Sequence, residues 1–470
     1  MKVVLHGFGS FPIVFWHMIQ HARSIDAPID WAIILTTDHH RELFVKLLGA
    51  ERVTVLNHAG AERYPPSTGD LVYPGALYRD IEAEKRTFKF APAGKQYARA
   101  MSLYRQVRDF MRGFKPTHAL VSQVEGFDGK VFIAAAREYG AEVVVPTSCR
   151  NLGGTFFSPD DVESLPVYAT GVHEHDRASA LAFIENFRHA PKPARWSPDV
   201  SGDEVLDAFV RPLPVRALAA ARRWLATPGG FQWDYLRASF LNNLPFLRDG
   251  IWAARRRANE RHCDIRSLEE LPRKFIFYPL QYTPESSINT PAPYFLDQFR
   301  AIDAIRFAMP SDCVLVVKEH PACILLREGS FVRRLQNTSG VVVAHYGLSS
   351  LELVKRAGLT ISVTGTATLE ALLLGRRAIT LGGSLVSGML GGVCSLGDLG
   401  SRIARELAAD IPDVEVVTAI ATLFNVRHEV LFGSPGTLGE PVLRRKNIAC
   451  LTEAFIDHCQ RVQLAANHAS

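Results

Sequence analysis

Three short polar segments in the second half of the 470-residue chain are the residues best suited to do chemistry. Each follows a stretch that predicts a buried strand, and they are Leu280–Ser287, Lys318–Pro321 and Thr364–Thr366. His320 supplies a cation or a neutral imidazole, and the threonines supply hydroxyl groups and backbone amides. Breaking a glycosyl phosphate ester requires that the charge on the departing phosphate is neutralised. The three segments together could do this without a metal ion, and no Asp-x-Asp pair lies near them.

The third segment has the pattern of a phosphate-binding turn. A short predicted strand, Thr360–Val363, leads into the small-residue turn Thr364-Gly365-Thr366 and then into a predicted helix, Ala367–Leu374. Free N–H groups and the positive end of the helix dipole favour a phosphate at such a turn. Glu370 could accept hydrogen bonds from ribose hydroxyls, or it could simply lie at the solvent edge of a capped helix. No Gly-Lys-Ser/Thr follows, so this is not a P-loop.

The other two segments add further polar groups for the same ligand. Gln281 and Glu285 follow the strand predicted at Phe275–Leu280, and Lys318 ends the strand predicted at Cys313–Lys318. A carboxylate such as that of Glu285 could bind ribose or acceptor hydroxyls. Because the carboxyl ends of parallel strands meet at one edge, we expect the three segments to converge.

Polar residues in the first half of the chain are weaker candidates for a functional role. His6 and Gly7 lie in a glycine-rich loop and could line the side where an acceptor binds, although a glycine needed only for packing explains this loop equally well. Arg150 and Asn151 follow a predicted strand and could meet an anionic sugar.

Two groups have the residue types of metal ligands, His173–Asp176 and Asp38–His40. Neither has a fixed third ligand or the helical HExxH spacing, so both predict exposed polar loops and no metal site. Asp160 and Asp161, which follow a proline, predict a turn.

Strands and helices alternate in the first half, which predicts a mostly parallel, doubly wound sheet. The predicted strands are Lys2–Leu5, Trp31–Leu35, Val53–Leu56, His118–Ser122 and Glu142–Val145. The predicted helices are Ile13–Arg23, Arg41–Leu48, Gln96–Phe114 and Lys130–Tyr139. The loops expected at the ligand-binding edge are His6–Ser10, Thr36–His40, Gln123–Gly129 and Thr147–Gly154.

A second alternation begins at Lys274. Besides the three strands already named, it predicts strands at Val341–Ala344 and Arg377–Leu381 and a loop at Gly382–Gly400. Its other predicted helices are Tyr294–Ala308, Phe331–Leu335, Ser349–Ala357, Pro412–Phe424 and Val442–Ala466. Two such halves with C-terminal helices predict the GT-B architecture, an α/β fold in which two Rossmann-like domains face a central cleft.

The predicted domains are 1–190, a Rossmann-like domain on the acceptor side, and 271–435, a Rossmann-like domain that binds the nucleotide-sugar. Between them, residues 191–270 predict a linker, Pro191–Pro198, and a helical insertion, Asp203–Glu260. Residues 436–470 predict a C-terminal helix.

Composition limits the kind of protein. Hydrophobic residues make up 47% and charged residues 21% of the chain, which is typical of a soluble globular protein. A net charge of +5 permits an anionic ligand and gives no indication of nucleic-acid binding. Seven scattered cysteines without a CxxC pair favour free thiols in the cytoplasm. The basic clusters Arg222-Arg223 and Arg255–Arg257 indicate solvated helix faces or, alternatively, peripheral docking on the inner face of the membrane.

Several segments resemble those of the bacterial capsule and surface-polysaccharide biosynthesis proteins, a family that includes GT-B Kdo transferases and is distantly similar to the bacterial sialyltransferases. They are LQYTPESS, VVKEHP and TGTATLEALLLG in the second half, and EGFDGK and SCRNLGGTFFSPDDVESLP in the first. The resemblance covers most of Met1–Pro166 and Lys274–Leu381.

The resemblance implies that His320 and Pro321 bind the nucleotide of a CMP-activated sugar and that Thr364–Thr366 bind its phosphate. Related GT-B enzymes carry their catalytic carboxylate before a glycine in the N-terminal domain, and both Glu125 and Asp128 match that pattern. The Gln-Pro element of some relatives is longer here, which leaves the role of Glu285 open.

The residues and the resemblance together predict a glycosyltransferase of capsule or lipopolysaccharide biosynthesis that needs no cofactor. It would transfer Kdo or a related ulosonic acid from a CMP donor to an oligosaccharide or glycolipid acceptor. His320 would hold the leaving phosphate, and Glu125 or Asp128 would act as general base or nucleophile. Two alternatives stay open: a nucleotide-sugar epimerase of the UDP-N-acetylglucosamine type, and a non-catalytic assembly factor.

Overall fold

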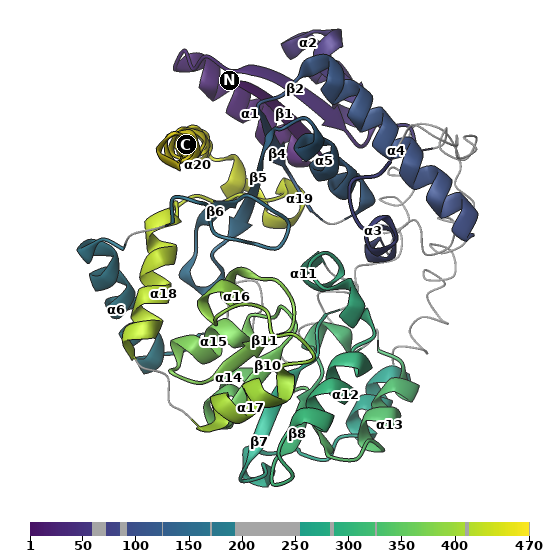
Figure 1. Ribbon diagram of the computed structural model, residues 1–470, viewed down its shortest axis with the longest axis vertical. Helices are drawn as coiled ribbons and strands as arrows, with labels where there is room; N and C mark the ends of the chain where they lie inside the picture. The colour runs from purple at the N-terminus through teal and green to yellow at the C-terminus, as the bar shows by residue number, and fades with distance from the viewer. Residues whose placement is uncertain are drawn as a thin grey trace.

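The chain forms two α/β bodies, each built on its own sheet, one above the other in Figure 1. The fold is that of a computed structural model, which describes residues 1–58, 72–84, 92–124, 126–169, 172–192, 254–282, 286–324, 327–408 and 413–469. Most of the predicted linker Pro191–Pro198 and of the predicted helical stretch Asp203–Glu260 lies outside these ranges.

The first body has a six-stranded sheet in the order β3-β2-β1-β4-β5-β6, in which only the edge strand β6 is antiparallel. The strands are β1 (Lys2–Gly7), β2 (Asp30–Leu35), β3 (Val53–Val55), β4 (His118–Val121), β5 (Glu142–Ser148) and β6 (Thr155–Ser158). The helices are α1 (Phe11–Ser24), α2 (Arg41–Leu48), α3 (Leu77–Ala83), α4 (Ala93–Phe114) and α5 (Phe127–Glu138).

The first sheet is covered on both faces, which explains why its strands are continuous apolar runs. Val4 packs with residues of α4 and α5 on one face, whereas Val3 and Leu5 pack with α1 on the other. Successive side chains of a strand point to opposite faces, so each strand contributes to two cores.

The second body has a five-stranded, all-parallel sheet in the order β11-β10-β7-β8-β9. The strands are β7 (Phe275–Pro279), β8 (Val314–Lys318), β9 (Val341–Ala344), β10 (Leu359–Ser362) and β11 (Ala378–Thr380). The helices are α11 (Ser286–Asn289), α12 (Phe299–Ala308), α13 (Gly329–Gln336), α14 (Ser350–Arg356), α15 (Ala367–Leu373), α16 (Leu385–Met389) and α17 (Leu399–Ala408).

Within the described residues, the chain crosses between the bodies at α6 and again at His428. Helix α6 (Glu174–His189) leaves the first sheet and packs against α18 (Asp413–Val426) on the second body, where Arg188 Nε donates to the carbonyl of Leu373 (3.0 Å). The chain returns at His428, which pairs through its backbone with Thr155 of β6. After the short α19 (Pro435–Leu438), α20 (Arg445–Ala469) packs on α1 (Figure 1). Two Rossmann-like bodies joined in this way form the predicted GT-B architecture, which is thus confirmed.

Two predicted loops contain regular structure, and one strand was not predicted. His173–Asp176 is not an exposed loop but the start of α6, where the Asp176 carboxylate accepts a hydrogen bond from the backbone N–H of His173 (3.3 Å). Gly382–Gly400 contains α16, and the antiparallel β6 follows Gly154. Each of these elements is short or begins with polar residues, so it lacks the apolar periodicity on which the prediction depends.

Buried histidines between the first sheet and α20 make stability sensitive to acid. His458 is 1% exposed, its Nδ1 lies 2.7 Å from the Tyr168 hydroxyl, and its ring packs on Phe157. Burial, with the charges of His428, His118 and Arg461, lowers its pKa to about 3. An unfolded histidine titrates near pH 6.5. The stability that depends on a neutral His458 is therefore complete above about pH 6.5 and is lost as the pH falls toward 3.

We therefore expect His458→Phe to flatten the acid side of the stability curve. The melting temperature of the native protein should fall more steeply between pH 6.5 and 4 than that of the variant, because phenylalanine cannot take up a proton. Thermal unfolding across this range measures the difference. The exposed His39→Asn variant is the control and should follow the native curve; parallel curves for His458→Phe would contradict the expectation.

Candidate functional site

Gln281 brings the ends of three strands together in the second body. It follows β7 and is 5% exposed. Its Nε2 donates to Ser362 Oγ at the end of β10 (2.9 Å), and its carbonyl accepts a hydrogen bond from Arg327 Nη2 (3.1 Å). Arg327 in turn pairs with Glu319, the residue after β8 (2.8 Å). The ends of β7, β8 and β10 are thus linked through Gln281, by its side chain to Ser362 and by its backbone carbonyl, through Arg327, to Glu319.

The turn after β10 is fixed by the same contacts. Ser362 Oγ also accepts the backbone N–H of Gly365 (2.9 Å). A Cβ at Gly365 would lie 2.7 Å from Ser362 Oγ and 3.0 Å from Gln281 Nε2, so no larger residue fits there. Thr366 precedes α15 and makes no capping bond through its hydroxyl. Glu370 is only 4% exposed within α15, so the alternative that placed it at a solvent edge is wrong.

His320 is a neutral imidazole at pH 7. It is half-buried at the end of β8, its backbone N–H donates to Glu319 Oε1 (2.8 Å), and its ring centre lies 5.7 Å from that of Tyr282. Burial, together with the charges of Lys318 and Arg327, lowers its pKa to about 4. Of the two states that the sequence left open, the cation is therefore wrong for the free protein.

The neighbours of His320 include a second buried cation. Lys318 is 2% exposed, and its Nζ donates to Ser350 Oγ at the start of α14 (2.8 Å). Pro321 begins a single 3-10 turn. Glu285 lies outside the described residues, and its nucleotide-binding role stays a prediction.

In the first body, Asp128 forms a buried polar group with residues from two strands. Its Oδ2 lies 3.2 Å from His6 Nε2, and His6 Nδ1 lies 3.2 Å from Ser122 Oγ. Burial alone would raise the pKa of Asp128, but the hydrogen bond with His6 and the charges of His6 and His58 lower it below its usual value. Asp128 is therefore an ionised carboxylate at neutral pH. Glu125, the other candidate carboxylate, lies outside the described residues.

Gly126 sets the entry into α5, the helix that carries Asp128. Its φ of +97° belongs to the region that favours glycine. A Cβ there would lie 2.6 Å from Asp128 Oδ1. The Glu84 carboxylate accepts the N–H of Phe127 (3.1 Å) and thereby fixes the first turn of the helix.

Contacts between the bodies place Asp128 opposite the segment that follows α11. Thr290 Oγ1 donates to the carbonyl of Val124 (3.3 Å), and Lys130 Nζ donates to the carbonyl of Thr290 (3.5 Å). Lys130 is 5% exposed and also pairs with Asp161. The loop after β4 is therefore bound to the segment after β7, so the carboxyl ends of the two sheets face each other.

These interbody residues were not identified from the sequence, although Lys130 ends the EGFDGK segment. The predicted turn at Asp160 is present, since its carboxylate accepts the N–H groups of Val162 (3.0 Å) and Ser164 (3.1 Å). Asp161 is more than a turn residue, because it neutralises the buried Lys130.

The predicted acceptor residues of the first body have partners within the fold. Arg150 Nη2 donates to both oxygens of Glu163 (2.7 and 2.6 Å), and Asn151 Nδ2 donates to a backbone carbonyl (3.3 Å). His6 is completely buried, so its ring contacts Asp128 rather than a surface open to an acceptor. A Cβ at Gly7 would lie 2.8 Å from Leu35 Cδ2, which favours the packing explanation. Contact of these residues with a sugar stays a prediction.

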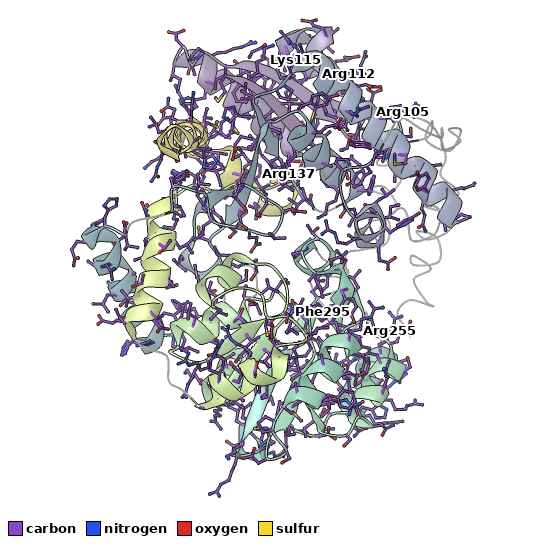
Figure 2. All side chains as sticks on the ribbon, in the orientation of Figure 1. Arg105, Arg112, Lys115, Arg137, Arg255 and Phe295 are labelled. Atoms are coloured by element: carbon purple, nitrogen blue, oxygen red, sulfur yellow. The ribbon has the colours of Figure 1, made fainter. Side chains whose placement is uncertain are left out.

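Three basic residues in the C-terminal half of α4 lie away from this site. Figure 2 shows Arg105, Arg112 and Lys115 along α4, on the side of the first body that faces away from the second. Arg112 pairs with Asp109 (2.9 Å). Arg222-Arg223, predicted as a membrane-docking cluster, lies outside the described residues. Within the part of the chain that the structure describes, no helix is long and apolar enough to cross a membrane.

No group of three or more histidine, cysteine, aspartate or glutamate side chains that could hold a metal ion occurs among the described residues. The predicted loop at Asp38–His40 is a single 3-10 turn.

One family model matches the second body. The model of the capsule polysaccharide biosynthesis proteins matches residues 235–423, which include all three segments around Gln281. A search of curated proteins finds no match.

Similar solved structures include enzymes of two kinds. UDP-GlcNAc 2-epimerase of Neisseria meningitidis is 11% identical over 97% of this chain and 100% of its own, with a TM-score of 0.24. The β-Kdo 2,7 transferase of Thermosulfurimonas dismutans KpsC is 14% identical over 75% of this chain and 98% of its own, with a TM-score of 0.32. The β-Kdo 2,4 transferase of the same protein is 14% identical over 65% of this chain and 79% of its own, with a TM-score of 0.29. These scores are too low to argue for one activity over another. Residues 235–423 of this chain are thus similar to the capsule polysaccharide biosynthesis proteins.

Proposed function

We propose that this chain is a glycosyltransferase of capsule polysaccharide biosynthesis that transfers Kdo or a related ulosonic acid from a CMP donor to a saccharide acceptor. The observation that carries the proposal is the meeting of three strand ends around Gln281, opposite a loop that holds an ionised carboxylate. All three strand ends lie within the residues matched by the family model. The identity of the donor rests on the resemblance of the His320-Pro321 and Thr364–Thr366 segments to those of CMP-sugar transferases.

In the proposed reaction, the second body binds the donor. His320, as a neutral imidazole, donates a hydrogen bond to a phosphate oxygen, and the hydroxyl of Thr366 donates another. The bond between the anomeric carbon and the phosphate oxygen breaks, and CMP leaves with both bonding electrons. Hydrogen bonds placed where charge develops stabilise this departure without a cationic side chain.

The first body activates the acceptor. Glu125 or Asp128 either takes the proton of the acceptor hydroxyl as it attacks the anomeric carbon, or attacks that carbon itself and is then displaced by the acceptor. The first route inverts and the second retains the configuration of the sugar. An acceptor carried on a lipid would bring the protein to the inner face of the membrane, and this peripheral association is part of the proposal.

Nucleotide binding is the first test. We expect CMP to raise the melting temperature, and UDP, GDP and CDP to leave it nearly unchanged, because a ligand that binds only the folded state stabilises it. At a hundredfold excess over the dissociation constant, the stabilisation is about 2.7 kcal/mol. Stabilisation by UDP instead, with conversion of UDP-N-acetylglucosamine in the absence of an acceptor, would identify an epimerase. No stabilisation by any nucleotide would favour the non-catalytic assembly factor.

A further inference from the structure

His6 connects the first strand of the chain to the carboxylate of Asp128. The two residues come from β1 and α5, and Ser122, which completes the group, follows β4. The imidazole is 0% exposed, and each of its nitrogens lies 3.2 Å from one partner oxygen. The ring also packs on Phe132, with the ring centres 5.2 Å apart. A side chain held at both nitrogens and along its ring has one orientation available.

The ionised carboxylate of Asp128 determines which nitrogen of His6 carries the proton. A carboxylate can only accept, so its contact with His6 requires the proton on Nε2. In a neutral imidazole Nδ1 then accepts the hydrogen bond from Ser122 Oγ, which itself accepts the backbone N–H of Phe8 (3.3 Å). The Nε2 proton points to Asp128 Oδ2, so the carboxylate receives a directed hydrogen bond.

The other oxygen of Asp128 lies at a position where only glycine fits. Asp128 Oδ1 lies beside Gly126, where a Cβ would be 2.6 Å away. Any residue other than glycine would therefore cover this oxygen. His6 engages one carboxylate oxygen, and beside the other lie Gly126 and the Glu84 carboxylate, whose Oε2 is 3.3 Å from the same Cβ position.

The remaining charged groups around Asp128 come from several elements. His58, after β3, contributes a favourable charge to Asp128, and Arg99 of α4 faces His58. Glu84, after α3, fixes the N–H of Phe127 beside it. Lys130, on the same helix as Asp128, is paired with Asp161. Of these groups, His58 acts with His6 to lower the pKa of Asp128.

We propose that His6 is a positioning residue that holds the Asp128 carboxylate in the orientation needed to act on the acceptor hydroxyl or the anomeric carbon. The inference rests on the proposed function and deepens it, because it assigns the catalytic carboxylate to Asp128. The opposing explanation is a purely structural link that joins α5 to the first sheet. The two explanations differ in what happens to the pH profile when His6 is replaced.

The test compares His6→Asn and Ser122→Ala with a matched control, His118→Asn, at the opposite end of the β4 strand. We expect His6→Asn to lower kcat about 100-fold, since a small displacement of a catalytic group has an effect of this size, with little change in the KM of the CMP donor. Ser122→Ala should lower kcat less, and it keeps the test valid if His6→Asn does not fold. His118→Asn should behave as the native protein.

The pH dependence of kcat distinguishes a positioning role of His6 from a purely structural one. Without the hydrogen bond from His6, the pKa of Asp128 rises, so the acid limb of the profile should move to higher pH in His6→Asn. The limb should move less in Ser122→Ala, which keeps His6 and removes only the hydrogen bond at its Nδ1. A purely structural link predicts a lower yield of folded protein with an unchanged limb. An unchanged limb and native kcat in His6→Asn would overturn the inference.

A second measurement needs no substrate. We expect the melting temperatures of His6→Asn, Asp128→Ala and the double variant to be non-additive at pH 7, because each single change breaks the same contact. Additive effects would also overturn the inference. If the wild-type protein transfers no sugar, the proposed function is wrong, and this result is obtained before any variant is made. If the wild-type protein transfers sugar and His6→Asn has the native kcat, only the inference about His6 is wrong.

Discussion

Replacing Asp128 with asparagine is expected to lower the rate of sugar transfer about 1,000-fold or more while CMP still binds. Asparagine has nearly the same shape, and its carbonyl can accept the hydrogen bond that His6 Nε2 donates across 3.2 Å. The fold around α5 should therefore persist. What is lost is the negative charge, which both proposed roles require: a neutral amide neither accepts a proton from a hydroxyl nor attacks an anomeric carbon.

The measurement is kcat at saturating donor, together with the thermal stabilisation by CMP. The matched variant is Glu125→Gln, because Glu125 is the other carboxylate that precedes a glycine in the same segment. We expect Glu125→Gln to keep transfer within about tenfold of the native rate, well short of the loss that follows removal of a general base. The reverse result, with Glu125→Gln inactive and Asp128→Asn active, would assign the reaction to Glu125. It would leave the transferase proposal standing and remove the inference about His6.

The pattern of apolar runs was enough to predict the two sheets. Helix α2 at Arg41–Leu48 and strand β9 at Val341–Ala344 have the bounds predicted from the sequence. Both sheets are covered on two faces, so their strands are short, nearly continuous apolar segments between polar loops. The elements that were missed differ in this respect. Strand β6 is four residues long and antiparallel, and α6 begins with Glu174-His175-Asp176, which carries no apolar periodicity.

The candidate site was only partly predictable, because its loops follow from local sequence and its contacts do not. In parallel sheets the loops after strands share an edge, which is why three segments could be named before their contacts were known. The bond between Gln281 and Ser362 joins residues 81 positions apart, and that between Lys130 and Thr290 joins residues 160 apart. No local pattern encodes such pairs, since they depend on how the two bodies are packed.

The protonation state and exposure of the site histidines also could not be predicted from the sequence. Whether His320 is charged depends on its burial and on two neighbouring cations, one of which, Arg327, lies in a segment that the sequence did not single out. His6 illustrates the same limit, because its loop suggested a residue open to an acceptor, and tertiary packing buries it completely. In both cases the residue was found from its position after a strand, and its chemistry was decided by contacts across the fold.

Replacing His320 is expected to weaken CMP binding in a way that depends on hydrogen bonding and not on charge. His320→Ala should raise the dissociation constant about 10-fold or more, because a hydrogen bond to a charged group contributes about 1.5 to 3 kcal/mol. His320→Gln should recover much of this loss, since an amide N–H can replace a neutral imidazole N–H. The control is His345→Gln, a half-buried histidine of the same body that lies after β9 and should bind CMP as the native protein does.

The pH dependence of binding tests the protonation state directly. The pKa of His320 is about 4 in the free protein. If the imidazole stays neutral in the complex, the ratio of the CMP dissociation constants of His320→Gln and the native protein is constant between pH 7 and 8. If bound phosphate instead raised the pKa above 8, the native protein would take up one proton on binding, and the ratio would change about tenfold per pH unit. Titration calorimetry in two buffers of different ionisation enthalpy detects that proton. A constant ratio with no proton uptake is the expected result, because Lys318 and Arg327 remain beside the ring and oppose a further positive charge.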